Sequence, residues 1–353
     1  MMPVPNVNRR FVAWLGVLAW VMGAAGCGPG PGRQFPLDTL SPKSDVTQKF
    51  FDLFYLITVL DILILIVVVV AFCLAIFVFS SRMGEPGEHS RKHHDLWLEL
   101  AWTIIPAIIV VLITVPTVRT IIQTQPDRWP PDTLEVRVIA HQWWWEFRYP
   151  QSGVVTANEA HIPIHRTIHF SMVSRDVIHS FFMPAIGGKR DVVPGQTNSI
   201  TLTANEVGEY WGQCTEFCGD SHANMRFRVF VDSPEDFAAW TKHQLAGPVK
   251  PEEGLAAAGA KVFADAPCAI CHTIRGVTGF SKEYTYGFRG PDLTHFGSRG
   301  TLAGAILDNT PENLARWITD PDAVKPGANM PTLGLQGHGE DLKELVAYLE
   351  SLK

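Results

Sequence analysis

Two long apolar runs near the start of the chain contrast with the alternating pattern that follows them. Residues 50–79 and 96–122 are almost wholly apolar, and Ile62 to Phe79 contains no charged residue. Each run exceeds the roughly 20 residues that a helix needs to cross a bilayer. A buried helix of a soluble core is the alternative, and an uncharged run of this length argues against it. The pattern therefore predicts a transmembrane helical hairpin over residues 50–122.

After Ile122 the chain changes to short runs in which polar and apolar residues alternate. This period of two is typical of half-buried strands. Pro and Gly residues separate the runs, which favours an antiparallel Greek-key sandwich or barrel over residues 131–232. The predicted strands are residues 134–139, 168–172, 199–203 and 225–231.

Helical signals return after residue 232. Ser233-Pro-Glu-Asp is a helix start, and the Gly- and Pro-rich residues 247–254 read as a linker, so residues 233–253 are expected to form a helix and a linker. The apolar residues between Leu342 and Leu352 recur at helical spacing, which predicts a closing amphipathic helix. We expect it to pack against a helix around Phe263, within an all-α domain over residues 254–353.

The first residues have the features of an export signal. Arg9 and Arg10 precede the apolar residues 11–22 and then a few small residues, so residues 1–26 are interpreted as a secretory signal peptide and residues 27–49 as an extracytoplasmic segment. The residues before Cys27 resemble a bacterial lipobox, with Ala24 where that pattern has Leu, which implies lipidation of Cys27. Export of this end places the loop between the two spans in the cytoplasm and the later domains outside it.

Charge and cysteine content narrow the function classes. The formal net charge of −6 gives no basic excess that would suggest a nucleic-acid partner. Of the six cysteines, Cys27 is assigned to lipid and Cys73 to packing within an apolar span. The other four form two close pairs that each need a chemical explanation.

The first pair stands among other soft metal ligands. Thiolate and thioether sulfur select copper, and imidazole completes such a site. A mononuclear blue-copper site uses a single Cys, so a second Cys four residues away indicates two coppers bridged by both thiolates. A disulfide is the alternative in an oxidising compartment, but it leaves the neighbouring His and Met unexplained. The candidate ligands are His179, Cys214, Cys218, His222 and Met225.

The second pair predicts a haem. Cys268-Ala-Ile-Cys271-His272 has the spacing of covalent c-type haem attachment, with His272 as the proximal iron ligand. Met330 is the preferred sixth ligand because it lies in Ala-Asn-Met-Pro, a setting that resembles the Met loop of class I cytochromes c. His295 and His338 are the competitors.

These motifs together resemble subunit II of haem-copper cytochrome c oxidases, over roughly residues 45–235. The resemblance begins with Gly212-Gln-Cys-Thr-Glu-Phe-Cys-Gly219 and extends to other segments in the family's order. Those segments are Glu99 with Trp102–Pro106, His141–Trp145, Asp176–Ser180 and Gly188–Gly195.

The resemblance implies a cupredoxin fold that holds a dinuclear copper centre, CuA. Cys214 and Cys218 would bridge the coppers, and His179 and His222 would each cap one copper. Met225 would bind one copper, and the main-chain carbonyl of Glu216 would bind the other. The family also implies a magnesium ion that the Glu216 side chain shares with subunit I.

Two further roles come from the same resemblance. Glu99 matches the entrance of a proton pathway into subunit I, and the alternative for it is a solvated carboxylate at the membrane interface. Trp143 matches a position over the copper where electrons enter, whereas Trp144 and Trp145 are expected to serve packing. Because the donor haem is fused to this chain, the importance of the surface around Trp143 is open.

The chain is therefore expected to be the subunit through which electrons enter a caa-type cytochrome c oxidase, a proton-translocating oxidoreductase. Electrons would come from an external cytochrome c or the bc complex and pass through haem c and CuA to subunit I, where oxygen is reduced. Subunits I and III would be the partners, in a bacterial inner membrane with the redox domains on the periplasmic side. The alternatives are the corresponding subunit of a CuA-type nitric oxide reductase, and a membrane-tethered redox carrier without a catalytic partner. A quinol-oxidase subunit II is excluded because that relative lacks the copper-binding Cys pair.

Overall fold

The computed structural model describes residues 37–77, 95–126, 128–248, 250–278, 290–332 and 339–353. The expected signal peptide, Cys27, the loop between the spans and His338 lie outside these residues. The chain divides into two compact units, one with residues 50–121 and one with residues 36–49 and 122–353.

The first unit contains most of two long helices, α2 (Asp45–Phe77) and α3 (Leu96–Thr124). Their apolar side chains are exposed on all sides rather than along one stripe, which suits a lipid environment and not a water-soluble surface. Both helices are long and apolar enough to cross a membrane. The predicted transmembrane helices are confirmed, although α2 begins before the apolar run, at Asp45.

The first residues of α2 belong to the second unit. Thr47 donates its hydroxyl to the carbonyl of Ala185 over 2.9 Å, and the Asp45 carboxylate accepts from the main-chain N–H of Thr203 over 2.7 Å. An acidic residue in a first helical turn interacts favourably with the free N–H groups there. These contacts fasten the helix start to the β domain.

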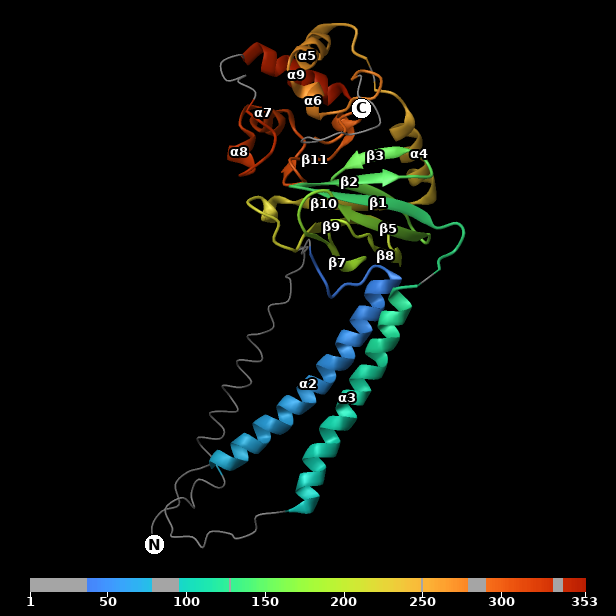
Figure 1. Ribbon diagram of the computed structural model, residues 1–353, viewed down its shortest axis with the longest axis vertical. Helices are drawn as coiled ribbons and strands as arrows, with labels where there is room; N and C mark the ends of the chain where they lie inside the picture. Colours follow the sequence, from blue (N-terminus) through green and yellow to red (C-terminus); the bar gives the residue numbers. More distant parts are fainter. Residues whose placement is uncertain (1–36, 78–94, 127, 249, 279–289, 333–338) are drawn as a thin grey trace. The chain divides into compact units, whose positions relative to one another are not determined.

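The β domain is a sandwich of two five-stranded sheets, which Figure 1 shows as two layers. The order is β3-β2-β1-β5-β8 in one sheet and β4-β10-β9-β6-β7 in the other. The strands are β1 (Leu134–His141), β2 (Trp144–Tyr149), β3 (Val154–Ala157), β4 (Glu159–Pro163), β5 (Thr167–Ser174), β6 (His179–Met183), β7 (Gly188–Val192), β8 (Asn198–Thr203), β9 (Gly208–Cys214) and β10 (Arg226–Asp232).

The sandwich confirms the predicted fold class, but its strands are not all antiparallel as expected. β1 pairs with β5 and β10 pairs with β4 in parallel, whereas the other pairs are antiparallel. In each parallel pair the chain leaves one sheet, passes through strands elsewhere and returns in the same direction. Local alternation indicates which face of a strand is buried, but it does not determine which strand pairs with it. The parallel pairing therefore could not be predicted from the pattern.

The core of the sandwich is aromatic. Phe181 and Phe227 stack with ring centroids 4.3 Å apart, and Trp145 packs edge-on against both. Gly212 faces this cluster, and a Cβ on it would lie 2.2 Å from the Phe227 ring. Glycine at this position in β9 therefore lets the rings fill the space between the sheets.

Helix α4 (Pro234–Leu245) follows the sandwich and packs along β3 and β4. It begins as predicted, because the Ser233 hydroxyl accepts a hydrogen bond from the N–H of Asp236. Trp240 lies edge-on to the buried Tyr149 of β2, with ring centroids 5.3 Å apart. The segment after α4 leads into the C-terminal domain.

The C-terminal domain is mostly helical and has its own hydrophobic core. Helices α5 (Gly254–Asp265) and α9 (Gly339–Ser351) cross at Gly259, where a Cβ would lie 1.9 Å from the Glu344 carbonyl oxygen. Phe263 packs on Tyr348 near this crossing, as the sequence predicts. The helices are α5 (Gly254–Asp265), α6 (Cys268–Cys271), α7 (Pro311–Thr319), α8 (Pro321–Val324) and α9 (Gly339–Ser351), with a short ladder of β11 (Thr301–Leu302) and β12 (Leu307–Asp308).

A buried carboxylate joins the C-terminal domain to the sandwich. Glu159, at the start of β4, is 5% exposed and accepts hydrogen bonds from the N–H and hydroxyl of Thr301 and from the N–H of Gly300. Three donors to one buried carboxylate compensate for the water it loses. The contact fixes β11 against the edge of the sandwich.

Candidate metal and haem sites

The copper-ligand candidates come from three places that the sheet brings together. His179 begins β6 and Cys214 ends β9, and these two strands are neighbours through the pairing of Phe181 with Cys214. The loop between β9 and β10 carries the other candidates and is closed by a hydrogen bond from the Cys214 N–H to the Met225 carbonyl. His222 starts a single 3-10 turn in this loop.

The side chains of these residues converge on one buried cluster. The two sulfur atoms of Cys214 and Cys218 are 3.7 Å apart. His179 Nδ1 lies 3.9 Å from the Cys214 sulfur, and His222 Nδ1 lies 3.6 Å from the Cys218 sulfur. The Met225 thioether is 4.0 Å from Cys218, and the Glu216 carbonyl oxygen is 3.3 Å from Cys214.

This geometry differs from a disulfide and fits a soft metal. A disulfide bond is about 2.05 Å long, so two sulfur atoms 3.7 Å apart are separate thiols. A thiolate sulfur binds a transition-metal ion such as Zn²⁺ at about 2.3 Å. Two sulfur atoms at the observed separation can therefore contact the same metal ion. Two sulfurs, two imidazole nitrogens, a thioether and a carbonyl form a donor set that suits copper.

Asp176 orients the first of the two imidazoles. His179 Nε2 lies 2.7 Å from the Asp176 carboxylate, which leaves Nδ1 to face Cys214. Burial on its own lowers the pKa of His179, but the hydrogen bonds to Asp176 and Cys214 outweigh it and raise that pKa above its ordinary value. Such a carboxylate behind a ligating imidazole fixes its tautomer and ring orientation.

Two main-chain donors hold Asp176 in this place. Burial favours the protonated carboxyl, but hydrogen bonds from His179 and from the N–H groups of Gln142 and Val177 lower the pKa of Asp176. The N–H of Gln142 donates over 2.6 Å and that of Val177 over 2.7 Å. The carboxylate therefore stays charged beside the imidazole.

One of the two thiols is prepared for metal, whereas the hydrogen bond to Cys214 and burial raise the pKa of the other, Cys218. The hydrogen bond between the two sulfur atoms lowers the pKa of Cys214, because it stabilises the Cys214 thiolate more than burial destabilises it. Hydrogen bonds from His179 and from the N–H of Ser180 act in the same direction. A thiolate is the form that binds metal, so the folded chain presents one in advance.

The Glu216 side chain points to a different partner. Its carboxylate is 45% exposed and lies 3.7 Å from the Lys189 ammonium group. Only its main-chain carbonyl belongs to the cluster. The expected magnesium ion on this side chain stays a prediction.

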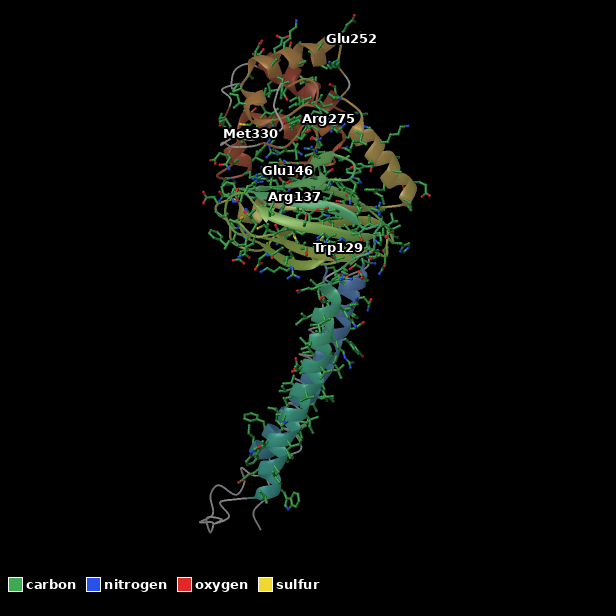
Figure 2. All side chains as sticks on the ribbon, turned by 45° about the vertical axis from the view of Figure 1, so that its right-hand side comes forward. Trp129, Arg137, Glu146, Glu252, Arg275 and Met330 are labelled. Carbon is green, nitrogen blue, oxygen red and sulfur yellow. The ribbon has the colours of Figure 1, made fainter. Side chains whose placement is uncertain are left out.

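A cavity of about 330 Å³ contains the candidates for haem attachment. Its walls include Cys268, Cys271 and His272 from the C-terminal domain and Met330 from the segment after α8. Figure 2 labels Met330 in the C-terminal domain. Apolar side chains such as Leu293, Phe296 and Trp317 form much of the remaining wall, beside polar residues that include Arg299, Lys325 and Asn329. This lining is what a large flat apolar group requires.

The orientation of His272 suits an axial ligand. Its Nδ1 lies 2.8 Å from the Pro291 carbonyl oxygen, which leaves Nε2 as the nitrogen available to iron. Burial lowers the pKa of His272 and so favours the neutral imidazole that binds metal. A Cβ on Gly290 would lie 2.5 Å from the ring, so glycine is needed beside it.

The competitor His295 has another partner. Its Nε2 lies 3.0 Å from the Ala246 carbonyl oxygen, and it does not line the cavity that Met330 lines. This geometry favours Met330 as the sixth ligand among the described residues.

The three consecutive tryptophans at positions 143–145 have different surroundings. Trp145 is fully buried in the sandwich core, and Trp144 stacks on His141 with ring centroids 4.4 Å apart. Trp143 is 8% exposed and donates its indole N–H to the Cys218 carbonyl over 2.9 Å. Gly219 lies against the Trp143 side chain, since a Cβ on Gly219 would be 2.9 Å from the indole ring.

Glu99, the candidate for the proton pathway, belongs to the first unit and lies in the first turn of α3.

Sequence reasoning missed several residues around the two sites. Lys325 and Asn329 donate to the Trp143 and Gln142 carbonyls, and Gln142 donates to the Cys218 carbonyl. Gln142 and Asp176 enter the sequence analysis only as members of motifs. The spacing Asp-x-x-His was the one available signal, for Asp176. The partners of the others are more than 70 residues away in the chain, so local pattern contains no sign of them.

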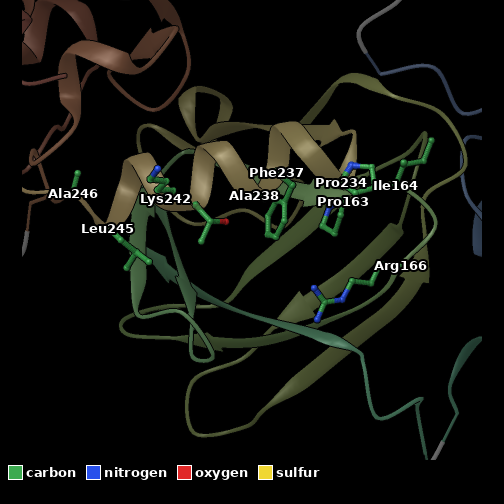
Figure 3. A pocket seen from close by; sticks show the side chains of 10 residues that line it. Pro163, Ile164, Arg166, Pro234, Phe237, Ala238, Lys242, Leu245 and Ala246 are labelled. Atoms are coloured by element: carbon green, nitrogen blue, oxygen red, sulfur yellow. The ribbon is translucent and has the colours of Figure 1, made fainter.

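A second cavity lies between α4 and the β4 edge (Figure 3). Pro163, Phe237 and Leu245 give it apolar walls, and Arg166 and Lys242 are its charged members. None of the metal or haem candidates lines it. It is a separate feature of the surface.

Comparison with known proteins agrees with the three parts of the fold. Residues 32–120 match the family described as the transmembrane domain of cytochrome c oxidase subunit II, and residues 151–231 match its periplasmic domain. Residues 256–353 match the cytochrome c family.

Two relatives match almost end to end. Cytochrome c oxidase subunit 2 of Alkalihalophilus pseudofirmus is 36% identical over 90% of this chain and 91% of its own length. The protein of the same name from Bacillus subtilis is 33% identical over 92% of this chain and 94% of its own length. Among solved structures, the periplasmic domain of cytochrome oxidase subunit II from Bradyrhizobium japonicum is 30% identical, with a TM-score of 0.32, and covers 33% of this chain and 95% of its own.

Proposed function

This chain belongs to the subunit II family of cytochrome c oxidases, and on that premise we propose which residues hold the two redox groups that the family implies. Subunit II is the part of the oxidase through which electrons enter, and here it carries a fused cytochrome c domain. The chain is thus a membrane component of an oxidoreductase complex that includes subunit I, with its soluble domains on the outer side. The near full-length oxidase relatives do not favour a nitric oxide reductase or a carrier without a catalytic partner.

We assign Cys214 and Cys218 as bridging ligands of a dinuclear copper centre. His179 and His222 supply one imidazole each, and Met225 and the Glu216 carbonyl complete the donor set. The observation that carries this assignment is the convergence of all six donor atoms, each within 4.0 Å of a cysteine sulfur. We assign Cys268 and Cys271 to covalent haem attachment and His272 and Met330 to the two axial positions.

Bound copper and haem each take up and release single electrons. The protein supplies their position and surroundings. The sandwich core excludes water from both thiols, Asp176 fixes the His179 ring, and the Pro291 carbonyl fixes the His272 ring. The preformed ligand positions keep the ligands from moving far when the oxidation state changes, and this favours fast electron transfer.

The remaining expectations are part of the same proposal. We propose that an external cytochrome c or the bc complex reduces the fused haem, and that subunit III is a further partner. We also propose that Glu99 lies at the start of a proton pathway into subunit I, and that Trp143 mediates electron transfer to the copper ligands. Its indole hydrogen bond to the Cys218 carbonyl supports the last assignment.

Electron paramagnetic resonance tests the copper assignment directly. The full chain in detergent, loaded with copper and haem, is expected to show hyperfine splitting from one electron shared by two copper nuclei, beside one covalent haem in the optical spectrum. Cys218→Ser is expected to lose the shared-electron signal and keep the haem spectrum. A single-copper pattern in the unchanged chain would contradict the assignment.

Proton uptake by the assembled oxidase tests Glu99. Glu99→Gln removes the titratable group and is expected to slow both proton uptake and turnover, because the pathway then lacks its first acceptor. Glu252→Gln, in the linker, is the matched control. Equal proton uptake in the two variants would exclude the role.

A further inference from the structure

The segment between α8 and Met330 contacts the sandwich at the turn that joins β1 to β2. Lys325 donates from its ammonium group to the Trp143 carbonyl, and Asn329 donates from its side-chain amide to the Gln142 carbonyl over 2.9 Å. Both carbonyls belong to one dipeptide. Asn329 is the direct neighbour of Met330, so this contact lies beside the proposed sixth iron ligand.

The same dipeptide contacts a proposed copper ligand on its other side. The Gln142 side chain donates to the Cys218 carbonyl over 2.7 Å, and the Trp143 indole donates to that oxygen over 2.9 Å. Two continuous routes of covalent and hydrogen bonds therefore lead from the haem segment to Cys218. One passes through Asn329 and Gln142, and the other through Lys325 and Trp143.

Burial of the Lys325 ammonium group in this contact is energetically unfavourable. It is 4% exposed, and no carboxylate in the described part of the chain forms an ion pair with it. Its ammonium group is instead satisfied by two carbonyls, those of Trp143 and of Ala303, the latter at 3.1 Å. A buried cation without a counter-ion opposes folding, so a neutral side chain would fill the same space at lower cost.

Glycines make the approach close enough for these bonds. A Cβ on Gly304 would lie 2.3 Å from the Lys325 nitrogen, and one on Gly327 would lie 3.2 Å from the Trp143 ring and 3.0 Å from Asp220. Both glycines have positive φ, at +83° and +75°. The Ser221 hydroxyl also donates to the Pro326 carbonyl over 2.5 Å. The segment is thus held at several points, with Lys325 at its most enclosed one.

We propose that residues 325–330 form the internal docking element through which the fused haem passes electrons to the copper site, and that Lys325 is the residue that positions it. This inference rests on the ligand assignments proposed above. In the transfer, the haem iron loses one electron and the copper pair gains one, while no bond forms and no proton moves. Lys325 acts through the main chain of Trp143 and does not itself change oxidation state.

The test measures internal electron transfer in the full chain, loaded with both redox groups. A photoactivated ruthenium complex reduces the haem, and the optical bands of haem and copper then report the transfer. Lys325→Met keeps the length of the side chain and removes its donors. Its transfer rate is expected to fall on the order of tenfold or more, because small displacements of positioned groups have effects of this size. The matched control is Lys261→Met, which removes an exposed lysine of α5.

Two further readouts separate positioning from general damage. The copper resonance spectrum, the haem spectrum and both reduction midpoints of Lys325→Met are expected to match those of the control. In the metal-free chain, hydrogen exchange at residues 142–144 and 325–330 is expected to quicken in Lys325→Met alone. If that variant does not fold, Asn329→Ala removes an exposed side chain of the same contact and is expected to slow transfer.

Failure of the docking role and failure of the copper and haem ligand assignments would give different results. Equal transfer rates in Lys325→Met and Lys261→Met would overturn the role of Lys325. Absence of the shared-copper signal in the unchanged chain would instead overturn the ligand assignment. A slow rate with altered copper or haem spectra would show that Lys325 supports the sites themselves, and would also overturn the positioning role.

Discussion

Lys325 illustrates how a single buried charge can make folding depend on pH. Burial lowers the pKa of its ammonium group from 10.5 to about 7, and the facing Cys218 thiol, when charged, offsets part of that effect. The unfolded chain therefore holds this proton up to a pH near 10.5, whereas the folded chain releases it near 7. Between these values the unfolded state binds more protons, so the free energy of unfolding rises with pH.

The pH dependence of unfolding should reveal this proton. In the metal-free chain, the contribution of Lys325 is expected to increase the free energy of unfolding by up to about 1.4 kcal/mol per pH unit between pH 7 and 10. Lys325→Met should lack that part of the rise. Denaturant titrations at several pH values measure the difference, with Lys261→Met as control. Parallel pH profiles for the two variants would contradict the assignment.

Asp176 is a residue whose effect reaches the metal through another side chain. Asp176→Asn keeps the shape of the carboxylate but removes its charge, so His179 loses the charged acceptor that fixes its ring. Copper affinity is expected to fall about tenfold, since partners of ligating residues commonly contribute 10–100-fold. Competition with a copper chelator measures this. Asp265→Asn, an exposed change at the end of α5, should leave affinity unaltered, and an equal loss in both would argue against a specific role.

Among the elements, the pair α5 and α9 shows how closely two helices must approach to build the haem domain. Gly259 faces the Glu344 carbonyl at the crossing, with 1.9 Å available to a Cβ. Alanine is favoured over glycine within a helix by roughly 1 kcal/mol. Overpacking at a crossing commonly costs about 1–3 kcal/mol, and a main-chain carbonyl has little room to move. The cost of overpacking should therefore exceed the gain in helix propensity.

Gly259→Ala is thus expected to destabilise the haem domain by about 1–3 kcal/mol. Denaturant unfolding followed at the haem absorbance measures the change. Gly247→Ala provides the comparison, because nothing lies within 4 Å of a Cβ at that position. If the Gly259 variant were as stable as the Gly247 variant, the helices would have to separate more easily than their packing suggests.

Periodicity predicted the elements more completely than their assembly. The apolar runs predicted α2 and α3, Ser233 predicted the start of α4, and the leucines near the end predicted α9. Each of these signals is local, because it depends on residues within one or two turns. The parallel pairing of β1 with β5 was missed, since pairing is decided by contacts between distant segments.

The candidate site divides in the same way. Cys214, Cys218, His222 and Met225 stand close together in sequence, and their residue types alone indicate copper. Lys325 and Trp143 are 182 positions apart, and a lysine in a short loop is ordinarily a solvated surface residue. Only the folded arrangement reveals that it is buried against the turn beside the copper cluster.

The two proposed redox groups belong to two different hydrophobic cores of the chain. Cys214, Cys218 and Met225 are part of the core between the sheets, whereas Cys268 and Met330 pack against the core of the helical domain. Copper that binds only the folded sandwich stabilises that domain by mass action. Covalent haem remains attached when copper is removed. Copper removal should therefore lower mainly the stability of the sandwich and affect the helical domain less.

Thermal unfolding with two probes tests this division. A chelator that removes copper is expected to lower the unfolding midpoint of the sandwich, with circular dichroism of the strands as the probe. At a copper concentration 1,000 times the Kd the stabilisation lost is about 4 kcal/mol, or roughly 8–16 °C at about 2–4 °C per kcal/mol for a domain set of this size. The haem absorbance should shift less, and only as far as the Glu159 and Lys325 contacts couple the domains. Cys218→Ser, which lacks one bridging thiol, should show no chelator effect at either probe. An equal shift at both probes would mean that the two cores unfold as one unit, and a chelator effect that survives in Cys218→Ser would mean that copper binds elsewhere.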